Sequence, residues 1–162
     1  MVKHDFVVHT SWRGGREEIG KVKGDVISEQ ISIPSSLGGN GTGTNPDEML
    51  VAAASSCYII SLAATLERAK FTNIHLEIKS IGSAVFENGK FKMEKITHYP
   101  TISLTEEEKT RLNKRLPKLL DIADHHCMIS NSIRNNVKIE IQATIQDENL
   151  SLIHISEPTR PR

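Results

Sequence analysis

Hydrophobic residues are concentrated in two segments near the start of the chain. Residues 4–12 and 19–33 are rich in apolar and β-branched side chains, which predicts two strands. Gly14 and Gly15 lie between them and suit the turn of a β-hairpin. Glycine and proline are then frequent from residue 34 to 46, so we expect a long loop there, and long loops often have a function.

Apolar and polar residues alternate with a period of two in the second half of the chain. Two further strands are predicted at 74–86 and 90–104, because the Asn-Gly pair at 88–89 is the strongest short signal for a hairpin. A last strand is predicted at 136–146, where apolar and polar residues alternate again.

Between these segments the spacing becomes helical. A helix is predicted from Pro46 to about Lys70, with apolar residues on all sides, which indicates burial on most faces. Another helix should follow Thr105, where a capping-box pattern precedes leucines at 112, 116, 119 and 120. Pro117 should kink or divide this second helix, and "CMISNSIRN" should form a short helix or turn.

This order of elements defines an α+β fold with a mostly antiparallel sheet packed on long helices. The length suits one domain, which we assign to residues 1–148. The ending "SLIHISEPTRPR" does not continue the preceding pattern. We therefore interpret 149–162 as a non-native or disordered extension.

Composition limits the partners. The 20 basic and 20 acidic residues cancel, and aromatic residues make up only 4% of the chain, so nothing favours nucleic acid. We find no signal peptide and no segment approaching the roughly 20 apolar residues of a membrane span, so we expect a cytoplasmic protein. Two cysteines in a reducing compartment are more often free, catalytic or redox-active than structural.

Cys57 and Cys127 are the candidate nucleophiles. Cys57 lies about three turns into its helix, beyond the reach of the helix dipole, so an ionised Cys57 needs a cation from elsewhere. It could equally be a small core residue. Cys127 follows His125 and His126 and could begin a helix, which would make it the more acidic thiol. The residues alone do not decide which sulfur attacks.

Two other kinds of site compete with a redox pair. "DHHC" at 124–127 contains metal-ligand types, but adjacent residues rarely converge on one ion, and the spacing matches no common zinc pattern. We therefore expect no metal and no cofactor. A cysteine hydrolase would use His125 or His126 as its base, but no feature of the sequence marks an oxyanion hole.

Three segments, in order, resemble the OsmC/Ohr family of osmotically inducible and organic hydroperoxide resistance proteins. "GTNPDEMLVAAASSC" is similar to the family's first cysteine motif, and "CMISNSIRNNVKIEI" to its second. "GGR" at 14–16, followed by a strand and "PSSLGG", resembles the arginine segment. The second motif departs from the family pattern at Met128, where the family often has proline.

The resemblance implies an intertwined homodimer and a peroxidase that reduces organic hydroperoxides. Cys57 matches the peroxidatic cysteine, which becomes a sulfenic acid, and Cys127 matches the resolving cysteine, which forms a disulfide with it. A dithiol, in this family commonly a lipoyl group, then reduces the pair.

The resemblance also assigns the missing cation to Arg16, with Arg13 as the alternate. Asp47 matches the family glutamate that pairs with the arginine, although it is one methylene shorter, and Glu48 could replace it. Ten residues of helix separate Asp47 from Cys57 by roughly 15 Å. Either the helix starts after Asp47, or the acid and the arginine reach the cysteine from another subunit.

A different class of function remains open beside the peroxidase. A non-enzymatic OsmC-like domain could bind a small apolar or thiol ligand in the same interface pocket. Asp47 and Met128, which depart from the family pattern, and the few aromatic residues favour this alternative.

Overall fold

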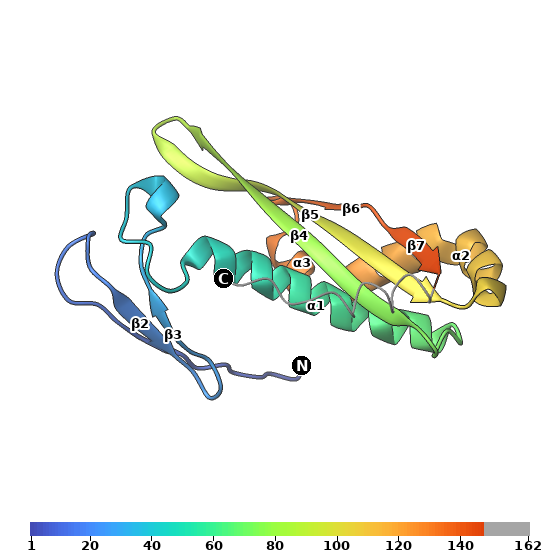
Figure 1. The fold of residues 1–162 in the computed structure, drawn as a ribbon. Helices are drawn as coiled ribbons and strands as arrows, with labels where there is room; N and C mark the ends of the chain where they lie inside the picture. The colour runs from blue at the N-terminus through green and yellow to red at the C-terminus, as the bar shows by residue number, and fades with distance from the viewer. Residues whose placement is uncertain (148–162) are drawn as a thin grey trace. The chain divides into compact units, whose positions relative to one another are not determined.

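The computed structural model describes residues 1–147, so the predicted extension at 149–162 lies outside the described residues. The elements form an α+β fold, as predicted (Figure 1). The chain divides into two compact units, one of Met1–Leu50 and one that starts at Val51. The assignment of 1–148 to a single domain stays a prediction.

The N-terminal unit contains an antiparallel sheet of β1 (His9–Ser11), β2 (Gly20–Lys23) and β3 (Ser28–Ile31). The prediction of one strand over 19–33 is therefore wrong. The chain reverses after β2, where the Gly24 N–H donates to the Ile27 carbonyl at 2.8 Å. The turn at residues 24–27 lies inside the segment that was predicted as one strand, because apolar and β-branched residues continue on both sides of Gly24.

Backbone hydrogen bonds within the loop after β3 give it a defined conformation. It contains a short 3₁₀ helix, η1 (Ser35–Leu37), and ends at an isolated bridge between Ile31 and Thr44. Gly38 follows η1 with φ of 82°, a left-handed conformation that glycine adopts without steric cost.

Helix α1 (Pro46–Arg68) begins where the sequence predicts. The Asn45 side chain accepts a hydrogen bond from the Glu48 N–H at 2.8 Å, which caps the first turn. Six of its residues are buried, but Ile60 on another face is 69% exposed. The expected burial on most faces is therefore wrong for the single chain.

The length and apolar character of α1 also correct the expectation that no segment resembles a membrane span. By length and composition alone, α1 could cross a bilayer, with a mean hydropathy of 1.9 over its most apolar window. The core helix of a soluble protein meets the same test.

The predicted second hairpin is confirmed as β4 (His75–Glu87) and β5 (Lys90–Leu104). Asn88 and Gly89 have φ of 55° and 76°, the two positive values that a type I′ turn requires. The register shifts between Ser83 and Ala84, which marks a bulge next to Gly82. Figure 1 shows α1 running alongside this long hairpin.

Gly82 of β4 packs closely against Val51 of α1. A Cβ added there would lie 2.4 Å from Val51 Cγ2 and 3.1 Å from Met93 Sδ. We expect Gly82→Ala to destabilise the protein by about 1–3 kcal/mol, because the stiff valine cannot move away without shifting the backbone. Urea unfolding measures this, with Gly15→Ala as control, since a Cβ at Gly15 meets nothing within 4 Å. Equal unfolding midpoints for the two variants would contradict the expectation.

Helices α2 (Glu106–His125) and α3 (Met128–Ile133) follow β5. The Thr105 carbonyl, not its side chain, accepts from the first turn of α2, so the predicted capping box does not form. Pro117 does not divide α2. Pro117 is exposed, so the carbonyl that loses its partner one turn earlier can be hydrated.

The predicted last strand is two strands, β6 (Lys138–Ile141) and β7 (Thr144–Asp147), and both pair with β5 in parallel. β6 pairs with Lys95–His98 and β7 with Thr101–Leu104. The break between them faces Pro100, which is buried in β5 and has no N–H to offer the ladder. A proline some forty residues earlier in the chain thus divides the strand.

The core of the C-terminal unit lies between α1, α2 and the sheet. It includes Tyr58, Leu62 and Leu66 of α1 against Ile102 and Leu104 of β5, with leucines and an alanine of α2, Phe71 and Cys127 completing the cluster. The sulfur of Cys127 is therefore part of the main core, and Cys57 packs against its edge.

Candidate active site

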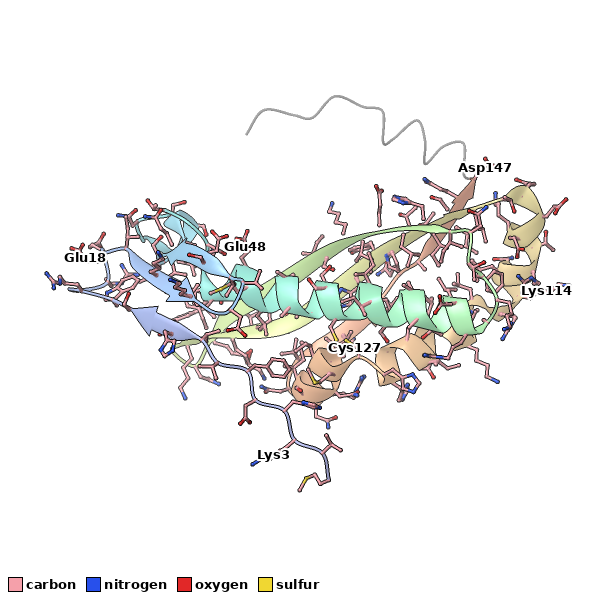
Figure 2. The ribbon with its side chains drawn as sticks, turned by 90° about the horizontal axis from the view of Figure 1, so that it is seen from below. Lys3, Glu18, Glu48, Lys114, Cys127 and Asp147 are labelled. Carbon is pink, nitrogen blue, oxygen red and sulfur yellow. The ribbon has the colours of Figure 1, made fainter. Side chains whose placement is uncertain are left out.

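Cys57 and Cys127 meet in the C-terminal unit. Cys57 lies within α1 and is partly buried, while Cys127 is fully buried as the N-cap residue of α3. Figure 2 labels Cys127 beside the start of that helix. Both are free thiols, and Cys57 is close enough to Cys127 to affect the pKa of its thiol. The two cysteines, 70 positions apart in the chain, are therefore side by side.

The position of Cys127 matches its prediction, but its acidity does not. Burial raises the pKa of the Cys127 thiol above its ordinary value, and hydrogen bonding and charge interaction with Cys57 raise it further. The hydroxyl and the backbone N–H of Ser130 oppose this rise without overcoming it. The expectation that Cys127 is the more acidic thiol because it begins a helix is wrong, since desolvation outweighs the end of a six-residue helix.

Cys57 opens onto a cavity of about 370 Å³, within the size range of small-molecule sites. The cavity follows one face of α1, because Cys57, Ser61, Ala64 and Arg68 recur at helical spacing. Ile60 from α1 and His126 and Met128 from the α2–α3 junction complete the lining. The surface is mostly apolar, with the guanidinium of Arg68 and the ring of His126 as its basic groups.

Sequence reasoning missed Arg68 and treated His126 only as a base or ligand. Arg68 is eleven residues, or about three helical turns, beyond Cys57, so the helix period alone placed it on the cysteine's face. His126 was indicated by nothing except its neighbour Cys127. Met128, where the family often has proline, lies in the same wall and is 59% exposed.

The junction of α2 and α3 is held by one ion pair. Arg134 donates to Asp124 Oδ2 at 2.8 Å and to the Asp124 carbonyl at 3.2 Å, and the Cys127 N–H donates to that same carbonyl at 3.2 Å. Arg134 also donates to Asn131 Oδ1 at 2.9 Å. These contacts fix the backbone that carries Cys127.

Behind the cysteines, His98 of β5 is fully buried. Its ring stacks on Tyr58, with centroids 5.2 Å apart and planes 5° from parallel, and Ser80 Oγ lies 2.6 Å from its Nδ1. Burial lowers the pKa of His98, although the charge of Asp124 acts in the opposite direction. The imidazole is therefore held neutral near pH 7.

His98 should make the fold sensitive to acid. Because its folded pKa is below the ordinary value of 6.5, its contribution to stability is complete above that pH and is lost as the pH falls through the folded pKa. We expect His98→Gln to flatten the decline of unfolding free energy below pH 6.5, by at most about 1.4 kcal/mol per pH unit. Urea unfolding between pH 7.5 and 5 measures this. His125→Gln, at an exposed position, is the control, and equal slopes for His98→Gln and wild type would refute the assignment.

The other predicted residues lie in the N-terminal unit. Arg16 donates to the Leu37 carbonyl at 3.3 Å and to the Gly38 carbonyl at 3.4 Å. The fold therefore brings Arg16 into contact with "PSSLGG", the loop that follows it in the segment resembling the family's arginine segment. Its ion pair, at 3.6 Å, is with Glu17. Arg13 lines a separate cavity with Trp12 and other residues.

Asp47 and Glu48 are in the first turn of α1. The option that the helix starts after Asp47 is therefore wrong. Glu48 accepts a hydrogen bond from the Thr44 hydroxyl at 2.5 Å. Within residues 1–147, neither acid forms an ion pair with Arg16, whose carboxylate partner is Glu17.

The chain is similar to known proteins over most of its length. Residues 39–142 match the family model described as OsmC-like protein. The uncharacterized protein YmaD of Bacillus subtilis (strain 168) is 36% identical over 146 residues, covering 90% of this chain and 97% of YmaD. The organic hydroperoxide resistance protein of Xanthomonas axonopodis pv. citri is 24% identical, covering 84% and 92%. The crystal structure of the organic hydroperoxide resistance protein OhrB of Bacillus subtilis superposes with a TM-score of 0.64 at 25% identity, covering 86% and 98%.

Proposed function

The chain belongs to the OsmC-like family, and on that basis we propose that it is a thiol peroxidase that reduces organic hydroperoxides. One observation carries this proposal: a partly exposed cysteine on a cavity wall lies next to a second, fully buried cysteine. Relatives named for organic hydroperoxide resistance agree with it.

The proposed cycle uses both sulfurs. The Cys57 thiolate attacks the distal oxygen of the hydroperoxide, the O–O bond breaks, and the alkoxide leaves as an alcohol after taking a proton. Cys57 becomes a sulfenic acid. Cys127 then forms a disulfide with it and releases water, and a dithiol donor of the lipoyl type restores both thiols by exchange. The apolar wall formed by Ile60 and Ala64 suits the organic part of the peroxide.

Arg16 is proposed to supply the positive charge that Cys57 lacks within its own helix, because a guanidinium stays charged and can both stabilise a thiolate and orient a peroxide. Asp47 is proposed to orient Arg16. Arg13 and Glu48 are the alternates for these two roles. Since α1 already includes Asp47, the proposal that remains is delivery of the acid and the arginine from a second subunit.

We further propose a cytoplasmic homodimer. Along α1, Ile60 and several small apolar residues remain exposed in the single chain, and a second copy of the helix would cover them. A dimer also explains why α1 is apolar enough to span a membrane, because the second copy would bury the apolar residues that one chain leaves exposed.

Whole-protein mass spectrometry tests the function directly. One equivalent of cumene hydroperoxide should remove two hydrogens from each chain, with both thiols then protected from alkylation. A gain of one oxygen with Cys127 still alkylatable would show that no disulfide follows. No change in mass would favour the alternative, a non-enzymatic domain that binds an apolar or thiol ligand in the cavity, and a burst of acylation by an activated ester would indicate a hydrolase.

A further inference from the structure

Ser130 is a buried polar residue with an unused hydroxyl. It is fully buried in α3, and its Oγ has no hydrogen-bond partner among residues 1–147. A serine hydroxyl in the core normally finds a partner, because leaving it without one costs free energy. The group that would use this hydroxyl should therefore lie nearby.

A candidate one helical turn away is the sulfur of Cys127. Cys127 is the N-cap residue of α3, and Ser130 is the third residue of that helix. In this arrangement a cap side chain can accept from the backbone N–H of the third residue, although the neutral Cys127 thiol forms no such cap hydrogen bond. The helical turn is closed, since the Asn131 N–H donates to the Cys127 carbonyl at 3.0 Å. Both the hydroxyl and the N–H of Ser130 act to lower the pKa of the Cys127 thiol, against the larger rise that burial causes.

Disulfide formation needs that anion. The Cys127 thiolate must attack the sulfur of the Cys57 sulfenic acid, so that the S–S bond forms as the S–O bond breaks. The hydroxide that leaves takes up the proton that Cys127 gave away, and the products are the disulfide and water. Because Cys127 is fully buried, water cannot solvate its charge during this step.

We propose that Ser130 is a positioning residue that holds the Cys127 thiolate, through its hydroxyl and its backbone N–H, during disulfide formation. This role rests on the proposed peroxidase cycle. It explains why the hydroxyl is idle while Cys127 is a neutral thiol, since such hydrogen bonds often tighten only when charge develops.

The first test does not require peroxide. In a Cys57→Ser background only Cys127 can form a thiolate, and its ultraviolet absorbance can be followed against pH after subtraction of the variant that lacks both cysteines. Adding Ser130→Ala should lower the thiolate fraction at a given pH by about tenfold, as expected for loss of one hydrogen bond to a charged group. The other ionisable groups of this region are unchanged; they are Tyr58 on α1, His98 on β5, Asp124 on α2, and His126 and Arg134 at the α2–α3 junction.

Matched variants separate this role from a structural one. Ser132→Ala removes an exposed hydroxyl of the same helix, which donates to the Met128 carbonyl at 2.8 Å, and should leave the titration unchanged. Ser130→Thr keeps a hydroxyl and should restore it. Removing a hydroxyl without a partner costs little stability, so Ser130→Ala should keep its Tm. A lower Tm with an unchanged titration would overturn the proposal.

The second test follows the two steps of the reaction in the protein with both cysteines. After one equivalent of cumene hydroperoxide, Ser130→Ala should form the sulfenic acid at the wild-type rate and the disulfide about tenfold more slowly. An unchanged rate of disulfide formation overturns the proposal. If the wild-type protein forms no disulfide, the peroxidase cycle itself fails, while the titration still decides whether Ser130 holds the Cys127 thiolate.

Discussion

Replacing Cys57 with serine is expected to lower the reduction of cumene hydroperoxide at least a thousandfold, in an assay coupled to a lipoyl or small dithiol donor. The hydroxyl of serine does not ionise near neutral pH, and oxygen attacks a peroxide poorly. The cavity itself should survive, because the change is small and Cys57 contacts only the edge of the main core.

Cys127→Ser should give a different result. The first step needs only Cys57, so each chain should still consume one equivalent of peroxide and keep a sulfenic acid that dimedone traps. Turnover should then fall, because an unresolved sulfenic acid is open to further oxidation. Ser132→Ala, at an exposed position on α3 outside the cavity, is the control and should retain most of the activity. Equal peroxide consumption by wild type and Cys57→Ser would rule out the proposed function.

Arg16→Ala is expected to lower kcat/KM for the hydroperoxide about a hundredfold. This estimate is the usual loss of rate when an enzyme loses one charged or hydrogen-bonding group that stabilises charge in the transition state. In the structure, both hydrogen bonds of the guanidinium go to the carbonyls of Leu37 and Gly38, which hold it against the loop after β3. Arg16→Lys should also be impaired, because an ammonium cannot reproduce the planar fork of the guanidinium.

Arg13→Ala is the matched control for Arg16, since it removes an exposed arginine three residues away. We expect less than a threefold effect, as for most surface substitutions away from a site. A larger loss in Arg13→Ala than in Arg16→Ala would exchange the two assignments. The same comparison between Asp47→Asn and Glu48→Gln identifies which acid orients the arginine, and Glu48→Gln also disturbs the contact with Thr44.

Mixed dimers decide which subunit supplies the arginine. Cys57→Ser and Arg16→Ala chains, each inactive alone, can be refolded together. If Arg16 acts on the cysteine of the other subunit, every mixed dimer contains one intact site, and about a quarter of wild-type activity should return for random pairing. If Arg16 acts within its own chain, no intact site forms and the mixture stays inactive.

The sequence predicted local features more reliably than features that depend on distant residues. The Asn88-Gly89 turn and the start of α1 depend on neighbours in the chain, and both were found where expected. The break between β6 and β7 could not be predicted from residues 136–146, because its cause is Pro100 on the partner strand. The exposure of Pro117, which lets α2 continue, is likewise decided by packing.

The candidate site shows the same limit. A family resemblance, not spacing, paired Cys57 with Cys127, and the geometry brings them together. The acidity expected for Cys127 failed because its burial is a tertiary property. Arg68 could have been found from the helix period alone, whereas Ser130 became a candidate only when its hydroxyl proved to be buried without a partner in the described part of the chain.

The connections of the sheet differ greatly in the chain entropy that they cost. The turn at Asn88 and Gly89 lets β4 and β5 pair along their whole length after closing a loop of two residues. Pairing β6 with β5 instead closes the segment 105–137, which at the usual dependence on loop length costs about 2.5 kcal/mol more. That segment carries α2, α3 and Cys127. A part of the burial energy around the cysteines, about that of one large apolar side chain, therefore offsets the cost of closing the segment that contains one of them.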